Sequence, residues 1–139
     1  MEQASKELLI KDIGARLKYG VKASVYSYWN ESYLDDYIVG VDIEEDDFLC
    51  STIPGVRCEI ILTKPYLFPL SSMTEEQKKE YTHIVNYISS DDTDNWKEGE
   101  FIYVEQLEQL MHFYHKNHFD YRGLISMGLA IDCSNLNIY

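Results

Sequence analysis

The spacing of apolar residues changes twice along the chain, and each change predicts a different kind of element. Leu9, Ile13 and Leu17 lie at i, i+4 and i+8, a spacing that predicts an amphipathic N-terminal helix within residues 1–20. Ser5 is the candidate residue to cap the start of this helix, and Gly20 is the candidate to end it. Apolar residues then alternate with polar ones, which predicts three or four strands within residues 21–63.

The predicted strands are short and follow one another directly, which favours an antiparallel meander. A run over 48–53 is the expected partner of the last strand, with Pro54 and Gly55 forming the turn between them. Such a meander curls into a small barrel or a strongly bent sheet, and we expect Val41, Ile60 and Leu62 in its core. The alternating sets are Val21, Ala23, Val25 and Trp29; Tyr37, Val39, Val41 and Ile43; and Val56, Cys58, Ile60 and Leu62.

The second part, residues 64–139, is predicted to be mainly helical and to pack on the sheet. Thr74 and Gln77 have the spacing of a capping box, so a helix should begin at Thr74. A polar linker is expected near 89–99, followed by a helix over about 104–117 that buries Leu107 and Leu110 against the sheet. The chain is therefore interpreted as one α+β domain spanning 1–139.

Composition limits the classes of partner. The 139 residues carry 12 Lys and Arg against 24 Asp and Glu, a net charge of −12. Such a chain repels phosphate backbones, so direct nucleic-acid binding is not expected. No apolar stretch approaches the roughly 20 residues that span a bilayer, and the start lacks the apolar core of a signal peptide. We therefore expect a cytoplasmic protein that does not bind membranes.

The three cysteines are an odd number without C-x-x-C spacing, which fits neither a disulfide framework nor a zinc ribbon. If Pro54 and Gly55 form a two-residue turn, Cys50 faces Glu59, and Cys58 points to the other face of the sheet. This register predicts no disulfide within the chain. The chain also lacks G-x-S-x-G, G-x-G-x-x-G and phosphate-binding glycine loops, so no catalytic residue and no cofactor is assigned.

The one cluster with metal-ligand character combines three histidines and an aspartate. His112 and His115 lie one helical turn apart, while His118 and Asp120 follow the predicted helix end. The metalloprotease spacing H-E-x-x-H is absent. We favour histidines that face solvent or cap the last carbonyls, and keep a metal site as the alternative. Just beyond, Asp120 and Arg122 are expected to pair across a turn above buried Phe119 and Leu124.

Acidic residues are spread over several segments, which favours a role in solubility. The run from Asp42 to Asp47 fails as a calcium loop, because Asp47 and Ile53 stand where Gly and Glu are required. The functional alternative is a surface that mimics DNA and captures a DNA-binding protein. Aromatic residues, in contrast, crowd one strand and the turn after it, and they are candidates for contact with a protein partner: Tyr26, Tyr28, Trp29, Tyr33 and Tyr37.

Three motifs carry a resemblance that spans nearly the whole chain: YGVK at 19–22, KPYLFPLSSMTEEQ at 64–77 and HFDYRGLISMGLA at 118–130. The chain resembles small uncharacterised proteins of Bacteroides-type gut bacteria and of their prophages or mobile elements. The resemblance implies a bacterial intracellular setting and supplies no activity and no catalytic residue.

Three hypotheses follow from the sequence. The first is a non-enzymatic protein-binding or accessory protein, in which the aromatic residues contact another protein. The second is an acidic decoy for a DNA-binding host protein. The third is a metal-dependent enzyme that uses His112, His115 and Asp120. An enzyme of this kind would retain a metal through purification. A decoy would bind a basic host protein with an affinity that falls steeply with salt, whereas a protein-binding module would bind its partner with weak salt dependence.

Overall fold

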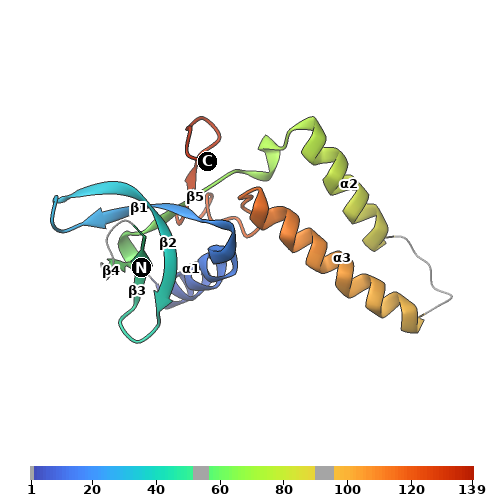
Figure 1. The fold of residues 1–139 in the computed structure, drawn as a ribbon, viewed down its shortest axis with the longest axis horizontal. Coiled ribbons are helices and arrows are strands. Elements are labelled where there is room, and N and C mark those ends of the chain that lie inside the picture. The colour runs from blue at the N-terminus through green and yellow to red at the C-terminus, as the bar shows by residue number, and fades with distance from the viewer. Residues whose placement is uncertain (1, 52–56, 90–95) are drawn as a thin grey trace.

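The computed structural model describes residues 2–51, 57–89 and 96–139 and shows an α+β protein with an N-terminal helix and a six-stranded sheet (Figure 1). The helices are α1 (Gln3–Arg16), α2 (Glu75–Ser89) and α3 (Trp96–Lys116), with 3₁₀ turns η1 (Leu17–Tyr19), η2 (Ile60–Leu62) and η3 (Leu70–Ser72). The strands are β1 (Lys22–Ser27), β2 (Ser32–Asp42), β3 (Asp47–Cys50), β4 (Arg57–Glu59), β5 (Lys64–Leu67) and β6 (Ile131–Asp132).

Helix α1 confirms the predicted apolar stripe. Leu9 and Ile13 are fully buried, and Leu17 packs against the same core from η1. The helix begins at Gln3, so Ser5 lies inside its first turn instead of capping it, and its amide donates to the Glu2 carbonyl. Gly20 adopts φ +78° and donates its amide to the Leu17 carbonyl. Helix α1 itself ends at Arg16, and Gly20 ends the 3₁₀ turn η1 that follows it, because this left-handed backbone favours a residue without a side chain.

The sheet has the order β4-β3-β2-β1-β5-β6 and is not closed. Strands β1 to β4 form the expected antiparallel meander, and β5 pairs antiparallel with β1. Strand β6 pairs parallel with β5, so the expectation of a purely antiparallel sheet is wrong. The sequence pattern predicted neither β5 nor β6: β5 contains Pro65, and β6 has only two residues.

Strand β2 buries a different set of side chains from the predicted one. The pairing of β2 with β3 shifts between Ile38 and Gly40, so Val39 lies in a bulge. Before the bulge the inward residues are even-numbered, and Ile38 is buried while Tyr37 and Val39 are exposed. After it, Val41 is half-buried against the core. An extra residue in one strand reverses which alternate side chains face inward, and sequence alternation cannot show where this happens.

Cys50 and Cys58 form a disulfide, which contradicts the predicted absence of one. Phe48 pairs with Cys58 and Leu49 with Arg57, a register different from the one a two-residue turn at Pro54 and Gly55 would impose. In the observed register the two cysteines lie on the same face of β3 and β4, both buried. Pro54 and Gly55 themselves lie outside the described residues. Cys133 is a free, buried thiol.

The main core lies between α1 and the inner face of the sheet, with the segment after α3 closing it. Ile60 is buried as predicted, Leu62 is half-buried, and Leu124 and Leu129 from the C-terminal part of the chain complete the cluster. Phe119 is also buried, as the sequence predicted for the turn that follows α3.

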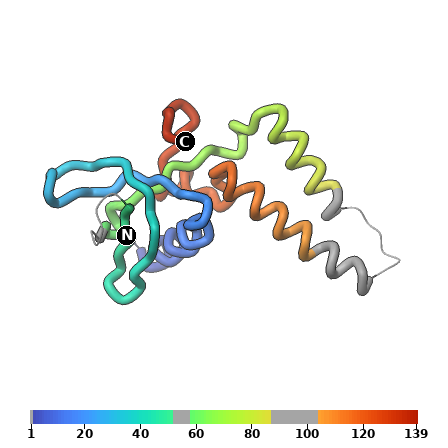
Figure 2. Tube along the Cα trace, in the orientation of Figure 1, coloured from blue at the N-terminus to red at the C-terminus, as the bar shows by residue number. Residues whose placement is uncertain are grey.

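Helices α2 and α3 form a hairpin that extends away from the sheet (Figures 1 and 2). The capping box is confirmed: the Thr74 amide donates to Gln77 Oε1 at 2.8 Å, and the Gln77 amide donates to Thr74 Oγ1 at 3.2 Å. Helix α3 begins at Trp96, earlier than predicted. Leu107 is 42% exposed and Leu110 half-buried, so the predicted docking of these leucines on the sheet is wrong.

A second apolar cluster holds the helical hairpin together instead. Phe113, Ile84 and Phe119 are its buried members, with Tyr81 and Leu110 packed around them. The hairpin thus buries its apolar residues between its own helices and against the segment after α3.

Candidate functional site

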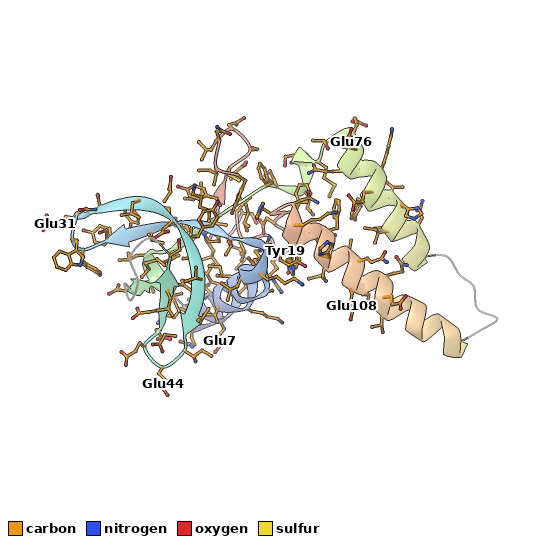
Figure 3. All side chains as sticks on the ribbon, in the orientation of Figure 1. Glu7, Tyr19, Glu31, Glu44, Glu76 and Glu108 are labelled. Atoms are coloured by element: carbon orange, nitrogen blue, oxygen red, sulfur yellow. A yellow bond between two sulfur atoms is a disulfide. The ribbon has the colours of Figure 1, made fainter. Side chains whose placement is uncertain are left out.

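The aromatic candidates gather at the far end of the β1–β2 hairpin. We call Tyr26, Tyr28, Trp29 and Tyr33 the aromatic hairpin. Trp29 is 87% exposed, and Tyr28 and Tyr33 are 60% and 59% exposed, while Tyr26 is half-buried between its neighbours. Glu31, in the connecting turn, marks this end of the molecule in Figure 3, opposite Glu108 on α3. Large aromatic side chains at such exposure are poorly explained by packing.

Local pairing explains how the rings are positioned. Tyr26 and Tyr33 are cross-strand partners, and their ring centroids lie 5.2 Å apart at an interplanar angle of 68°. Tyr28 meets Tyr26 edge-on at 5.0 Å and 84°. Ala23 and Val25 point into the core, so Tyr26 faces outward by strand alternation. Edge-to-face contacts of this kind order the rings without burying them.

The same outer face is covered nearer the centre of the sheet. Tyr66 donates a hydrogen bond to Asp35, and the Lys22 amide donates to the Tyr139 hydroxyl at 2.9 Å. Tyr37, the fifth aromatic candidate, is 41% exposed, and the Lys22 ammonium lies 5.3 Å from its ring centroid. Strand β5 pairs only with Ala23 and Ser24 of β1. The aromatic hairpin therefore lies beyond the part of β1 that β5 pairs with, and Tyr37, opposite Lys22, lies at the other end of the β1–β2 pairing.

A groove of about 420 Å³ that is rich in carboxylates lies between α1, the β2–β3 turn and β4. Asp47 and Glu59 are cross-strand partners in β3 and β4, and Lys6 forms an ion pair with Asp46 at 3.1 Å across the groove. The Glu59 carboxylate, which lines this groove, raises the pKa of Tyr28. The groove is lined by Lys6, Glu45, Asp46, Asp47, Glu59, Ile60 and Ile61.

A buried charge network lies on the other side of the core. Asp12 and Arg16, one helical turn apart on α1, are both fully buried and form a two-point ion pair at 2.8 and 3.1 Å. Arg122 adds a second pair to Asp12 at 3.1 Å, and Arg16 donates to the Phe119 carbonyl at 2.7 Å. The expected pair of Asp120 with Arg122 is therefore wrong, because Arg122 reaches across to α1.

Tyr121 and His115 extend this network towards α3. The guanidinium carbons of Arg16 and Arg122 lie 5.2 and 5.0 Å from the Tyr121 ring centroid. His115 Nε2 and the Tyr121 hydroxyl are 2.8 Å apart. Burial, aided by the nearby Arg16 charge, lowers the pKa of His115 to about 4, so the imidazole is neutral near pH 7. A neutral imidazole among two arginines avoids adding a third buried cation.

The structure brings His112 and His115 to one groove beside Tyr19, whereas His118 and Asp120 have other partners. His112 Nδ1 lies 2.8 Å from the Tyr19 hydroxyl, and the His118 ring stacks on Tyr139 at 3.6 Å. Asp120 accepts the amides of Leu124 and Ile125, both at 2.9 Å, and so caps the following turn. Within residues 2–51, 57–89 and 96–139, no group of three His, Cys, Asp or Glu side chains is arranged to hold a metal ion.

A second groove of about 530 Å³ opens between η1 and α3, at the edge of the buried charge network. His112 and Tyr19 form its polar side, and Leu107 and Met111 belong to its apolar side. Figure 3 labels Tyr19 where α1 meets α3. The groove contains the neutral His115, the Lys18 ammonium and the Glu108 carboxylate. The opposite charges of Lys18 and Glu108 offset each other, so they do not favour a charged ligand.

Thiol chemistry has no support in the described structure. Burial and the neighbouring Asp132 carboxylate raise the pKa of Cys133 to about 11. The thiolate that would act as a nucleophile is therefore scarce near neutral pH.

Sequence reasoning missed the buried charge network. The i, i+4 spacing of Asp12 and Arg16 was its one local signal, and this spacing is common on solvated helix faces. Nothing in the sequence shows that both side chains are buried, because the segment that covers them, around Phe119 and Tyr121, lies more than 100 residues away. The aromatic hairpin, by contrast, was visible from the clustering of Tyr and Trp.

Comparison with known proteins found no detectable similarity to a family model, to a curated protein or to a solved structure. In the part of the chain that the structure describes, no helix combines the length and the apolar character needed to cross a bilayer.

Proposed function

We propose that this protein is a non-enzymatic binding module whose aromatic hairpin inserts into an apolar pocket on a protein partner. The observation that carries the proposal is the combination of Trp29 at 87% exposure with Tyr28 and Tyr33 at about 60% on one uncovered hairpin end. Trp and Tyr dominate the binding energy of many protein interfaces, because they bury much area with few rotatable bonds.

The shape of the molecule favours a partner that supplies the concave surface. The hairpin lies at one end of the protein (Figure 1), and its rings are ordered by edge-to-face contacts before any partner arrives. Such preorganisation lowers the entropy cost of association. A second copy of the chain is a less favourable occupant, because two molecules of charge −12 repel each other.

The two alternatives have weaker support. The enzyme hypothesis needs His112, His115 and Asp120 to converge. The two histidines line one groove beside Tyr19, whereas the Asp120 carboxylate accepts the amides of Leu124 and Ile125. The decoy hypothesis needs an array of carboxylates on one face, whereas Glu31, Glu44, Glu76 and Glu108 mark different ends of the molecule in Figure 3. A cytoplasmic location and an origin in a bacterial mobile element remain predictions from the sequence.

The test compares binding by the unmodified chain with binding by Trp29→Ala. A partner captured from the source bacterium and identified by mass spectrometry is purified, and its dissociation constant is measured by calorimetry. Loss of a central aromatic contact should weaken binding by at least about thirtyfold, because such contacts are worth 2 kcal/mol or more. Leu136→Ala, which removes an exposed apolar side chain elsewhere, is the matched control. Equal affinity of Trp29→Ala and the unmodified chain would contradict the proposal.

A further inference from the structure

We infer that the protein binds its partner by strand addition: an extended basic segment of the partner pairs antiparallel with the outer edge of β2 over residues 32–36. The inference rests on the proposed function, because it names how a protein partner is held next to Trp29. The observations that carry it are the register of β2 with β1, the point where β3 stops, and the charge of Asp35.

Printed backbone contacts fix which residues of β2 point to its outer edge. In an antiparallel ladder, successive residues direct their N–H and C=O groups to opposite sides of the strand. The Ile38 amide donates to the Val21 carbonyl at 3.0 Å, so Ile38 points to the β1 side. The Tyr37 carbonyl points the other way, where it accepts the Ser51 amide at 3.0 Å.

Tyr33 and Asp35 continue this alternation, because β1 and β2 pair without a register shift over residues 32–37. Each therefore directs one amide donor and one carbonyl acceptor to the outer edge of β2. Strand β3 pairs with β2 only from Ile38 to Asp42, and the β1–β2 hairpin extends past it (Figure 1). Within residues 2–51, 57–89 and 96–139, no strand pairs with this edge at 33 or 35. An added strand satisfies backbone groups in this arrangement.

The opposite edge of the hairpin, on β1, is a poorer site. The Lys22 amide donates to the Tyr139 hydroxyl at 2.9 Å, and Ser24 pairs with Lys64 of β5. By the same alternation, Tyr26 is the one residue of β1 past Ser24 that points its backbone groups to this edge. One residue offers half the hydrogen bonds that Tyr33 and Asp35 offer together on the other edge, so strand addition favours β2.

Side chains on the outer face specify the sequence of the added strand. Tyr33 and Asp35 stand two residues apart on that face, and both are exposed. Directly opposite side chains in an antiparallel pair lie about 4.5–5.5 Å apart. The partner strand therefore places one residue against the Tyr33 ring and another, two positions along, against the Asp35 carboxylate. A β-branched or aromatic residue suits the first position, and a lysine or arginine suits the second.

The Asp35 carboxylate is positioned for such a contact. The Tyr66 hydroxyl donates to Asp35 Oδ1 at 2.5 Å and holds the carboxylate on the outer face. A carboxylate has a second oxygen, which can accept from the partner's ammonium or guanidinium. The same charge disfavours a second copy of the chain, because two β2 edges would bring two Asp35 carboxylates into one short ladder between molecules of charge −12.

A defined peptide tests the inference without the natural partner. The probe is the acetylated, amidated hexapeptide TVTKTV, whose valines and lysine share one face of a strand. It is titrated into the ¹⁵N-labelled full chain, and TVTETV is the matched control. TVTKTV should produce saturable amide shifts centred on Tyr33 and Asp35, slow hydrogen exchange at these two amides, and bind about fivefold more tightly than TVTETV. Equal shifts over the acidic segments 42–47, 75–80 and 105–108 would overturn the inference, because they would indicate non-specific attraction.

Backbone methylation of the peptide separates strand addition from attraction between side chains. In the antiparallel register, the N–H of the peptide's lysine points at β2, whereas the N–H of the threonine that follows it points to solvent. Methylation of the lysine amide nitrogen should weaken binding at least about fivefold, since it removes a ladder hydrogen bond. Methylation of the threonine amide nitrogen should change the affinity less than about twofold. Equal effects of the two methyl groups would contradict strand addition.

A charge exchange tests Asp35 itself. Asp35→Lys should weaken binding of TVTKTV about fivefold and strengthen binding of TVTETV by a similar factor, because the favourable cross-strand pair is restored with reversed sign. Glu44→Lys makes the same charge change at an exposed position in the β2–β3 turn and should leave the ratio of the two affinities unchanged. An unchanged ratio in Asp35→Lys would also overturn the inference.

Two further measurements separate this inference from the proposed function. A dimer of the unmodified chain in sedimentation, dissociated by TVTKTV, would show that a second copy occupies the edge and would overturn the inference. If an identified partner requires Trp29 but does not protect the Tyr33 and Asp35 amides, strand addition fails while the proposed function stands. If TVTKTV adds to β2 as described and no protein requires Trp29, strand addition stands and the proposed aromatic contact fails.

Discussion

The aromatic hairpin and the buried charge network are both rich in tyrosine and in charge, yet they have opposite relations to solvent. The aromatic hairpin is built from residues 26–33, close in sequence, and leaves its largest side chains exposed. The buried charge network joins Asp12 and Arg16 of α1 to Tyr121 and Arg122, and its central ion pair is fully buried. Side chains of the same kinds thus remain exposed in one place and close the fold in the other.

The two regions also differ in how strongly the loss of one side chain lowers the free energy of unfolding. Removing a buried charged partner leaves the other charge without water, which is strongly unfavourable. Removing an exposed ring leaves only solvent-accessible surface behind, which changes the free energy of unfolding little. The comparison therefore predicts large stability effects in the network and small ones at the hairpin, and the following experiments test that order.

The largest effect is expected for Arg16→Ala. Asp12 would keep only its pair with the partly exposed Arg122, so the free energy of unfolding should fall by about 3–5 kcal/mol in a urea titration. A double variant, Asp12→Leu with Arg16→Met, removes both buried charges. Its free energy of unfolding should fall by less than that of Arg16→Ala. A loss below about 1 kcal/mol in Arg16→Ala would show that the buried ion pair does not hold the C-terminal segment to α1.

Phe113→Ala should destabilise the protein by a similar or slightly smaller amount. Phe113 of α3 is fully buried in a cluster with Ile84 of α2 and Phe119, and truncating a buried phenylalanine costs about 3–5 kcal/mol. Leu107→Ala, on the exposed side of the same helix, is the control and should cost about 0.5 kcal/mol or less. Equal losses in the two variants would indicate that α3 packs on the sheet through Leu107 after all.

An intermediate effect is expected from His115 as pH falls. Its pKa is about 4 in the folded protein and about 6.5 in the unfolded chain, so between these values the unfolded chain binds more protons. The contribution of neutral His115 to the free energy of unfolding is fully present above pH 6.5. This contribution, about 1–3 kcal/mol, is lost as pH falls towards 4. His115→Gln should flatten this part of a stability-against-pH curve. An unchanged slope would contradict the buried, neutral imidazole.

The smallest effect on stability is expected at the aromatic hairpin. Trp29→Ala removes a side chain that is 87% exposed, so the unfolding free energy should change by about 0.5 kcal/mol or less while partner binding is lost. A thermal melt of the variant beside the unmodified chain measures this directly. A clear drop in melting temperature would mean that Trp29 packs within the protein, and the surface would then lose its main support as a binding site.

Several features of the fold were determined by short-range sequence signals. The apolar stripe of α1, the end of η1 at Gly20, and the capping box at Thr74 depend on residues within one or two helical turns. The clustering of Tyr26, Tyr28, Trp29 and Tyr33 is equally local, because a tight hairpin brings near neighbours in sequence together. Local hydrogen bonding and periodicity act over these distances, so the sequence alone was sufficient for them.

Other features were decided by the tertiary structure, because they depend on partners far away in the chain. The bulge at Val39 set which face of β2 is buried, and the register of β3 with β4 brought Cys50 and Cys58 onto one face. Burial of Arg16 required the Phe119 carbonyl from the other end of the chain. The carboxylates Asp46 and Glu59 became neighbours in one groove only after folding. Strand register and burial are properties of the packed whole, since a shift of one residue exchanges inner and outer side chains without altering any local pattern.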